Sequence, residues 1–286
     1  EHNFSMTQVD IVGFHGQTIF HSFEKKISKQ LADGKLLANL IKNKVINKFR
    51  NNDINNGGQG APLVPVFHKL IQKKLDLFLP SVFVNIGGIS NLTYIGEEKD
   101  IESFDTGPGN FLIDKLLQQK SNNKIQFDKD GVIAFKGSVN EIILENYLSD
   151  PYYKKKPPKS LDVNNFSLKL IEGQSLENSI ATLSELTART IVESISHFKK
   201  KPKLIILCGG GRKNKYISSQ ISKLSKIQTI LIDFYKIDGD FIESQAFAYL
   251  SIRSLLKKNI TFPSTTGVKK PLTGGILSKP ELLSIK

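Results

Sequence analysis

The sequence predicts an α/β protein. Short apolar or β-branched runs alternate along its 286 residues with longer stretches of helical periodicity, which is typical of a sheet flanked by helices. Four glycine-bearing turns follow predicted strands. Because ligands of an open α/β sheet bind beyond the carboxyl ends of its strands, these turns predict a single cleft lined by several loops.

The predicted elements follow one another in chain order. Apolar runs predict strands at residues 9–13, 82–86, 92–95, 101–104, 204–208 and 230–232. Helical spacing predicts helices at residues 36–41, from about 110, at 176–198 and at 240–256, and Ser175 stands where it can cap the longest of them. Two prolines make residues 154–159 an exposed loop. The strand-turn-strand pattern that restarts near Val82 predicts a second lobe beginning there.

Composition and charge argue against several classes of protein. The net charge is +13, but the lysines are spread through the chain and no nucleic-acid-binding motif accompanies them, so a nucleic-acid partner is not expected. The abundance of Lys, Asn and Ile indicates an AT-rich coding bias, which would raise the charge without any function. In the alternative interpretation, the positive potential helps to attract anionic substrates. The apolar runs are too short to cross a bilayer. The single cysteine, Cys208, rules out an intrachain disulfide and suits a reducing cytoplasm.

The first two glycine turns offer polar groups at strand ends. The segment GFHGQT, residues 13–18, places a histidine, an amide and a hydroxyl there, although a buried, hydrogen-bonded histidine without a function would fit the same pattern. The segment NIGGISN, residues 85–91, reads as a β-hairpin with two glycines in its turn, which is a common arrangement. Neither turn alone identifies a site.

The third turn, FDTGPGN at residues 104–110, combines an acid with the start of a helix. The free N–H groups and the positive dipole end of that helix would suit a phosphate. Asp105 would then stand at the reacting centre, as a general base or as a neighbour of magnesium. A carboxylate that merely caps the turn is the alternative.

The fourth turn, CGGGRKN at residues 208–214, places three glycines after a buried strand. Backbone without side chains lets a flat ligand such as adenine lie against it, and Asn214 is placed to cap the next helix. A loop without a function rarely holds three consecutive glycines. The four turns together predict a phosphate-binding cleft between two lobes, as in the actin-like ATPases and sugar kinases.

Beyond these turns, the chain resembles the anhydro-N-acetylmuramic acid kinase family over nearly its whole length. The blocks that carry the resemblance occur in the family's order: GFHGQTIFH at 13–21, NKFRNNDINNGGQGAPLVP at 47–65, NIGGISNLT at 85–93, FDTGPGNFLID at 104–114, FDKDG at 127–131, PPKS at 157–160, CGGGRKN at 208–214, DGDFIESQAFA at 238–248 and PSTTG at 263–267. FDTGPGN, CGGG and GGQGAPLVP in one chain are a highly specific combination.

The resemblance implies the actin-like, ribonuclease-H-like two-lobe sugar kinase (ASKHA) fold. We expect residues 1–80 to form the remainder of the N-terminal lobe with sugar-binding elements, 81–258 to form the C-terminal lobe with the nucleotide-binding turns, and 259–286 to return to the cleft as a tail. Members begin with a glycine- and serine-rich loop that ends in an Asp-Gly pair and holds the ATP phosphates. Nothing similar precedes Gly13, so we expect an N-terminally truncated member whose own activity is open.

The resemblance also implies a reaction. Members use ATP, Mg²⁺ and water to hydrolyse the 1,6-anhydro bond of 1,6-anhydro-N-acetylmuramic acid and to phosphorylate O6, giving N-acetylmuramic acid 6-phosphate for peptidoglycan recycling. The expected partners are this sugar and ATP, in the cytoplasm, with a homodimer left open. The alternatives are a non-catalytic sugar-binding or scaffold remnant of the fold, or another sugar or acetate kinase, against which the GGQGAPLVP and PSTTG blocks argue.

Site residues follow from the matching positions. Asp105 matches the family's catalytic aspartate and would deprotonate the attacking water. Nucleotide contacts are expected from Gly87, Gly88, Asn91, Gly107, Gly109, Asn110, Gly209, Gly210, Gly211 and Asn214. Substrate contacts are expected from His15, Gln17, Thr18, Arg50 and Glu243. Arg50 would grip the lactyl carboxylate of the sugar, unless it is an exposed loop arginine. Glu243 would otherwise be a charge favoured by its helix dipole. No residue is assigned to magnesium.

Overall fold

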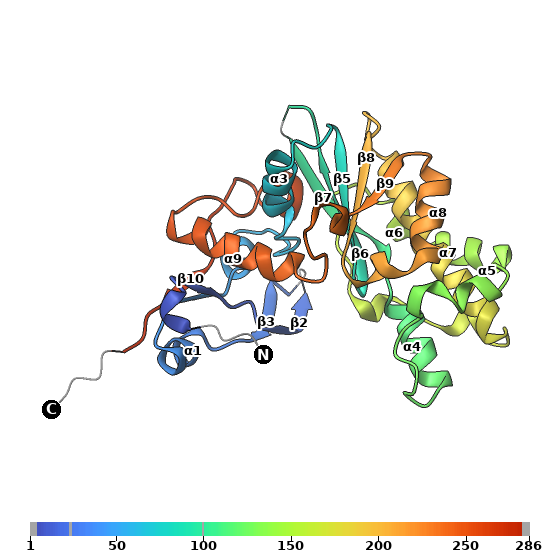
Figure 1. The fold of residues 1–286 in the computed structure, drawn as a ribbon, viewed down its shortest axis with the longest axis horizontal. Coiled ribbons are helices and arrows are strands. Elements are labelled where there is room, and N and C mark those ends of the chain that lie inside the picture. Colours follow the sequence, from blue (N-terminus) through green and yellow to red (C-terminus); the bar gives the residue numbers. More distant parts are fainter. Residues whose placement is uncertain (1–4, 23–24, 99, 282–286) are drawn as a thin grey trace. The chain divides into compact units, whose positions relative to one another are not determined.

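The chain divides into two compact units (Figure 1). The computed structural model describes residues 5–22, 25–98 and 100–281. The first unit comprises Glu1–Leu70 and Glu243–Lys286, and the second comprises Ile71–Ile242. The predicted lobes divide at residues 80 and 258, whereas the chain passes between the units at 70/71 and 242/243. The second crossing comes earlier because helix α9 (Ile242–Leu255) packs with the first unit.

A five-stranded sheet forms the framework of the second unit. Its strands lie in the order β7 (Ile101–Pro108), β6 (Ile89–Ile95), β5 (Ser81–Ile86), β8 (Leu204–Cys208) and β9 (Gln228–Leu231). Strand β6 is antiparallel to both of its neighbours, and β5, β8 and β9 run parallel. The spatial order is therefore third, second, first, fourth, fifth, with only the second strand reversed. That is the strand order of a ribonuclease-H-like domain, so the expected fold class is confirmed.

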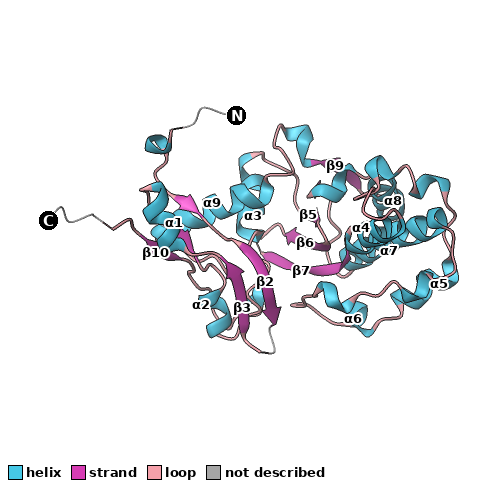
Figure 2. Cartoon of the chain, turned by 90° about the horizontal axis from the view of Figure 1, so that it is seen from below, coloured by secondary structure: helices cyan, strands magenta, loops and turns pink. Residues whose placement is uncertain are grey.

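Helices cover one face of this sheet and enclose its core. They are α4 (Phe111–Lys120), α5 (Glu141–Leu148), α7 (Leu176–Ser196) and α8 (Lys215–Ser225) (Figure 2). The short helix α6 (Pro151–Lys154) follows α5 in the sequence. Val82, Val84 and Ile86 alternate along β5, so all three side chains face these helices and are fully buried. Each such side chain contributes about 1.5–3 kcal/mol by leaving water. Ser175 caps α7, as predicted.

The first unit combines a small mixed sheet with a hairpin. Strand β4 (Val45–Asn47) lies between β1 (Val12–Gly13) and β10 (Ile276–Ser278), and β2 (Gln17–Ser22) pairs with β3 (Ile27–Leu31). Its helices are α1 (Gly34–Ile41), α2 (Asn51–Asn55), α10 (Pro263–Thr266) and α9, while α3 (Pro65–Lys74) spans the division between the units. The core joins residues from both ends of the chain: Ile46, Phe49, Leu63, Val66, Phe247, Leu250 and Ile260.

A buried carboxylate ties two of the family-like blocks together in the first unit. Asp53 is only 1% exposed. Its Oδ2 accepts a hydrogen bond from the Gly60 N–H at 2.7 Å, and its Oδ1 accepts one from the Thr266 hydroxyl at 2.7 Å. The Gln59 N–H donates to the Thr266 carbonyl oxygen, also at 2.7 Å. These hydrogen bonds hold the GGQG and PSTTG segments together, although the two segments are far apart in the sequence.

Several expected elements differ in the structure. Of residues 9–13, only Val12 and Gly13 pair with β4, so the predicted strand is shorter. Residues 154–159 are not an exposed loop throughout, because Lys159 is buried at 8% exposure. The hairpin β2–β3 was not predicted, since exposed positions interrupt the apolar alternation that marks a strand.

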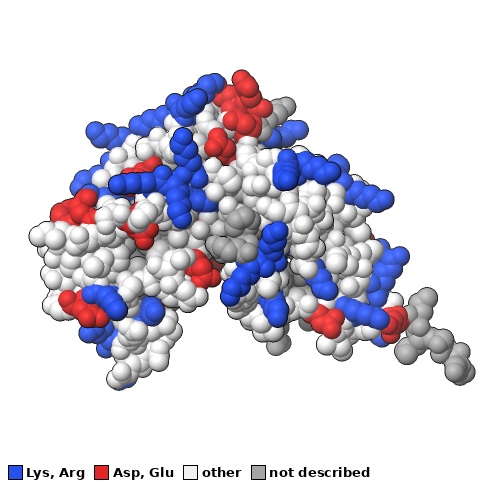
Figure 3. Space-filling model, turned by 180° about the vertical axis from the view of Figure 1, so that it is seen from behind, with Lys and Arg blue, Asp and Glu red and all other residues white. Residues whose placement is uncertain are grey.

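Basic side chains lie in several separate groups on the face shown in Figure 3, with acidic side chains among them. This distribution matches the dispersed lysines of the sequence. Among the residues described, none of the helices is both long and apolar enough to cross a membrane.

Replacing Gly109 by alanine should destabilise the second unit, because the new Cβ would overlap the carbonyl oxygen of Gly87. Overpacking of this kind costs about 1–3 kcal/mol. Gly88→Ala is the matched control, because its Cβ would approach only the Phe111 Cβ, at 3.9 Å, and should change stability by less than about 0.5 kcal/mol. Urea unfolding of both variants measures the difference, and equal midpoints would contradict this account of the turn.

Candidate functional site

Three of the predicted turns meet at one edge of the five-stranded sheet. Strand register aligns Asp105 with Asn91, Asn91 with Asn85, and Asn85 with Cys208, so these residues form one row across four strands. The turns that begin beside this row are residues 86–89, 106–110 and 209–213. The predicted convergence of glycine turns beyond the strands is thus present within the second unit.

Backbone hydrogen bonds join the first two of these turns. The N–H groups of Gly109 and Phe111 donate to the Gly88 carbonyl oxygen at 2.9 and 3.1 Å, and the Asn110 N–H donates to that of Gly87 at 2.8 Å. The sequence predicted that N–H groups at this helix start would be free for a phosphate. That expectation is wrong for these three groups, because the hairpin occupies them. Gly87, Gly88 and Gly109 therefore shape the turn through their backbone.

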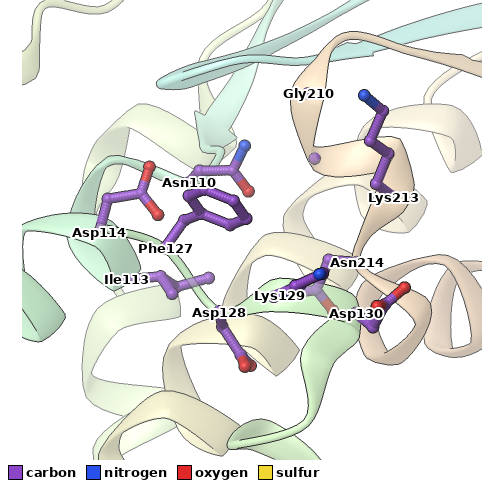
Figure 4. A pocket seen from close by; sticks show the side chains of 11 residues that line it. Asn110, Ile113, Asp114, Phe127, Asp128, Lys129, Asp130, Gly210, Lys213 and Asn214 are labelled. Carbon is purple, nitrogen blue, oxygen red and sulfur yellow. The ribbon is translucent and has the colours of Figure 1, made fainter. Parts of the chain in front are cut away.

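A pocket of about 490 Å³ opens beside the triple-glycine turn at residues 209–213 (Figure 4). Four of its lining residues were predicted to bind a nucleotide: Asn110, Gly210, Gly211 and Asn214. The others were not assigned any role from the sequence: Ile113, Asp114, Phe127, Asp128, Lys129, Asp130 and Lys213. Four of these, residues 127–130, belong to the FDKDG block. That block is one of those by which the chain resembles the family, so the resemblance could have pointed to these four residues.

The pocket has an aromatic wall and a backbone wall. The Phe127 side chain is 58% exposed, and Figure 4 shows its ring across the pocket from Gly210. A Cβ added to Gly210 would meet no atom within 4 Å, whereas one on Gly211 would overlap Ile86. Asn214 caps α8 through its amide oxygen, as predicted. A flat ring would fit between the Phe127 side chain and the glycine backbone.

A buried arginine holds the glycine turn in place. The guanidinium of Arg212, 2% exposed, donates from Nε and Nη2 to the two carboxylate oxygens of Asp233 at 2.6 and 2.7 Å. Its Nη1 donates to Asp240 at 2.5 Å and to the Gly209 carbonyl oxygen at 2.9 Å. The hydrogen bonds to Asp233 raise the pKa of the guanidinium further and lower that of the carboxyl. Gly209 itself has φ +77°, which favours glycine.

Two carboxylates of the pocket differ in their partners. Asp128, 4% exposed, accepts hydrogen bonds from the backbone N–H groups of Ile133 and Ala134 at 2.9 and 3.1 Å. Asp114, the fourth residue of α4, receives no side-chain hydrogen bond or ion pair from the described residues. Burial, and then the charge of Asp128, raise the pKa of Asp114 to about 6.

Asp105 lies at a β-bulge. Ser90 pairs with Gly107 and Asn91 with Asp105, so Thr106 is an extra residue, and its hydroxyl donates to the Ser90 carbonyl oxygen at 3.2 Å. Bulges bend a strand and re-aim its side chains, and they are frequent beside active sites. This irregularity could not be predicted from the sequence, because a single inserted residue leaves the apolar pattern almost unchanged.

A strap of chain from residues 152–161 holds Asp105 from one side. The Leu161 N–H donates to Asp105 Oδ2 at 2.8 Å, the Asp105 N–H donates to the Lys159 carbonyl oxygen at 3.1 Å, and the Tyr152 hydroxyl donates to the Asp105 carbonyl oxygen at 2.6 Å. Lys159 Nζ lies 4.6 Å from the Tyr152 ring centre and donates to the carbonyl oxygen of Tyr152 at 3.2 Å. Burial lowers the pKa of Lys159. The strap fixes both the backbone and one carboxylate oxygen of Asp105.

In the first unit, the structure brings His15 and Arg50 together. Arg50 Nε donates to His15 Nε2 at 2.9 Å, and its Nη1 donates to the Gly60 carbonyl oxygen at 2.7 Å. The His15 ring stacks on Phe247 with the ring centres 4.4 Å apart. Burial and the charge of Arg50 lower the pKa of His15 to about 4, so the imidazole is neutral at pH 7. Arg50 is half-buried, so the exposed-arginine alternative is wrong.

The remaining predicted substrate residues, Gln17, Thr18 and Glu243, also belong to the first unit. Gln17 is exposed on β2, and the neighbouring Thr18 hydroxyl accepts a hydrogen bond from Gln30 Nε2 at 3.3 Å. Glu243 is exposed in the first turn of α9, where the helix dipole favours an acid. Among the described residues, no group of three or more His, Cys, Asp and Glu side chains is arranged to hold a metal ion.

Comparison with known proteins gives consistent matches along the chain. The sequence profile described as anhydro-N-acetylmuramic acid kinase matches residues 1–279. A protein of that name from Pelagibacter ubique (strain HTCC1062) is 46% identical over 280 residues, covering 95% of this chain and 74% of that protein. One from Methylorubrum populi is 39% identical over 280 residues, covering 98% of this chain and 74% of that protein.

The likeness to solved structures is more distant. Xylulose kinase from Bifidobacterium adolescentis is 13% identical, with a TM-score of 0.41 over 75% of this chain and 44% of that one. The strand order of the second unit, rather than this likeness, carries the fold assignment. The profile match and the identity to the curated relatives show that the chain belongs to the anhydro-N-acetylmuramic acid kinase family.

Proposed function

We propose that this protein is an ATP-dependent kinase that hydrolyses the 1,6-anhydro bond of 1,6-anhydro-N-acetylmuramic acid and phosphorylates O6, producing N-acetylmuramic acid 6-phosphate for peptidoglycan recycling. Membership of the family carries the proposal. The pocket beside the triple-glycine turn and the strapped Asp105 support it, because both lie at the same edge of one sheet. The expected compartment is the cytoplasm, where a lone reduced thiol such as the buried Cys208 is stable.

Asp105 is the proposed general base. In this reaction water attacks C1, the C1–O6 bond breaks, and O6 attacks the γ-phosphorus, so that ADP leaves. The water must lose a proton as it attacks, and a carboxylate can accept that proton. The Leu161 N–H holds one oxygen of Asp105 at 2.8 Å, which supports a fixed orientation for the carboxylate. A base held in position loses less entropy in the transition state than a mobile one.

The pocket at the triple-glycine turn is the proposed adenosine site. Its aromatic and glycine walls suit a flat base, and its polar lining suits the ribose. Magnesium, when bound, would neutralise charge on the transferring phosphoryl group. Mg²⁺ usually binds through one or two carboxylates and the substrate phosphates, so the role does not need a larger cluster of protein ligands.

Arg50 is the proposed partner of the sugar's lactyl carboxylate. A guanidinium grips a carboxylate through two parallel hydrogen bonds, and its planar fork loses little freedom if it is already oriented. The neutral His15 ring and the Gly60 carbonyl oxygen orient Arg50 without cancelling its charge. Gln17, Thr18 and Glu243 stay candidates for contacts to the sugar.

Replacing Gly210 by valine should raise the KM for ATP by about tenfold or more, because the side chain would enter the pocket at a cost of about 1–3 kcal/mol. The fold should be unaffected, since a Cβ there meets no atom within 4 Å. The measurement is steady-state kinetics of the full-length protein, with thermal unfolding as a check. Gly210→Ala is the size control and should change the KM much less. An unchanged KM in Gly210→Val would contradict the adenosine assignment.

Replacing Asp105 by asparagine should lower kcat by about 10²- to 10⁴-fold, because the amide keeps the shape but cannot accept the proton. Sugar-dependent ADP release measures the rate. Sugar binding, followed by calorimetry, should persist, since the amide oxygen can still accept the Leu161 N–H. A kcat near that of the unmodified protein would show that another acid, such as Glu243, is the base.

Replacing Arg50 by lysine should raise the KM for the anhydro sugar by about tenfold, because an ammonium cannot form the paired hydrogen bonds. The same sugar without its lactyl group is the matched comparison, and its binding should hardly change. If both sugars lose affinity equally, Arg50 acts only through the packing of His15 and not on the carboxylate.

A further inference from the structure

Asp114 differs from Asp128 and Arg212 in the second unit. Its place in the first turn of α4 suits the helix dipole, but no hydrogen bond or ion pair from the described residues engages its carboxylate. It lines the pocket and is half-buried. Its backbone N–H belongs to the start of α4, donating to the Asn110 carbonyl oxygen at 2.8 Å. Within the described residues, however, its carboxylate has neither a hydrogen-bond donor nor an ion-pair partner. By contrast, Asp128 and Arg212 are buried with their hydrogen bonds satisfied.

An ionised Asp114 costs stability. Its carboxyl loses water on folding and meets the charge of Asp128, and both effects disfavour ionisation, which is why its pKa rises to about 6. The two preceding positions on α4, Leu112 and Ile113, are apolar and buried, while the following Lys115 is exposed. An acid that destabilises the fold at neutral pH and has no hydrogen-bond or ion-pair partner among the described residues is a candidate for contact with a ligand.

The pocket determines what kind of group such an acceptor would meet. Figure 4 shows Asp114 on the same side of the pocket as Phe127, across from Gly210. A base lying between the Phe127 ring and the glycine backbone would present its edge, rather than its face, to the remaining lining groups. An ionised carboxylate only accepts hydrogen bonds, so it favours an edge that carries an N–H donor and repels one that carries a carbonyl oxygen.

We propose that Asp114 selects adenine nucleotides by accepting a hydrogen bond from the exocyclic amine of the base and by repelling purines with an oxygen at that position. This inference rests on the proposed adenosine site. A site that is built for a hydrogen bond rejects analogues that cannot make it, because its buried polar group is left unpaired. For a charged acceptor the expected discrimination between the two classes of purine is about 10- to 100-fold.

The discrimination should depend on pH. Above pH 6 the Asp114 carboxyl is ionised and accepts, while below pH 6 it is protonated and can instead donate to a carbonyl oxygen. The preference for ATP over ITP should therefore fall as the pH drops through about 6. The charged groups that share the pocket with Asp114 are Asp128, Lys129, Asp130 and Lys213.

The test compares ATP, ITP and 2′-deoxy-ATP in the full-length protein and in Asp114→Asn. We expect the ratio of kcat/KM for ATP to that for ITP to fall by at least about tenfold in Asp114→Asn at pH 8, mostly through KM, and to lose its pH dependence. An unchanged ratio would overturn the proposal. So would a loss of discrimination between ATP and 2′-deoxy-ATP instead, because the carboxylate would then contact the ribose.

Asp130→Asn is the matched control. It removes the same charge from the same pocket, but Asp130 already pairs with Lys215 Nζ at 3.4 Å. Asparagine also tolerates the φ of +58° at this position. The ATP to ITP ratio of Asp130→Asn should change less than about twofold. A change as large as that of Asp114→Asn would show that only the net charge of the pocket matters, which would also overturn the proposal.

Thermal unfolding provides a readout that is independent of activity. Because the pKa of Asp114 is raised in the folded state, its ionisation opposes folding at high pH and has no effect below the unfolded pKa near 4. Asp114→Asn should therefore raise the unfolding midpoint at pH 8 and leave it unchanged at pH 3.5. A midpoint lowered at pH 8 would show that the carboxylate has a structural partner, and would contradict the proposal.

The outcome for Gly210→Val separates this inference from the proposed function. If Gly210→Val leaves the KM of every nucleotide unchanged, the pocket is not the adenosine site and both assignments fail. If Gly210→Val raises the KM for ATP but Asp114→Asn leaves the ATP to ITP ratio unchanged, the adenosine site stands and only the role of Asp114 is wrong.

Discussion

The site of the second unit depends on the backbone hydrogen bonds between two glycine turns. The N–H groups of Gly109, Asn110 and Phe111 donate to the carbonyl oxygens of Gly87 and Gly88, and a Cβ on Gly109 would overlap the Gly87 carbonyl oxygen. This contact fixes the start of α4, which supplies Asn110, Ile113 and Asp114 to the pocket. It also fixes the end of β7, where Asp105 lies. These hydrogen bonds between the two turns therefore position both the proposed base and one wall of the proposed nucleotide pocket.

Three charged side chains of the second unit have hydrogen-bond partners within the protein. Arg212 is bound by Asp233 and Asp240, Asp128 by two backbone N–H groups, and Lys159 by backbone carbonyl oxygens and an aromatic ring. Buried charges that keep such partners rigidify a structure, because moving them would leave an unpaired group. These partners hold the surroundings of Asp105 and Asp114 in place.

The two units contribute different chemistry to the proposed reaction. The second unit supplies a carboxylate at a bulged strand end and a pocket for a flat base. The first unit supplies a guanidinium oriented by a neutral histidine, whose pKa of about 4 leaves the arginine as the only charge of the pair at pH 7. In the proposed function, the group that recognises the acidic sugar and the carboxylate that serves the reaction belong to separate hydrogen-bonded frameworks.

The sequence by itself determined the fold class, the four glycine turns, the caps at Ser175 and Asn214 and the family, because periodicity, glycine and capping residues act over a few neighbouring positions. Tertiary structure decided the rest. The occupied N–H groups of the 109–111 turn, the bulge at Thr106 and the burial of Lys159 all depend on segments distant in sequence. So do the pairing of His15 with Arg50 and the position of Asp114 beside Asp128, since hydrogen bonds and desolvation depend on spatial neighbours that local sequence does not specify.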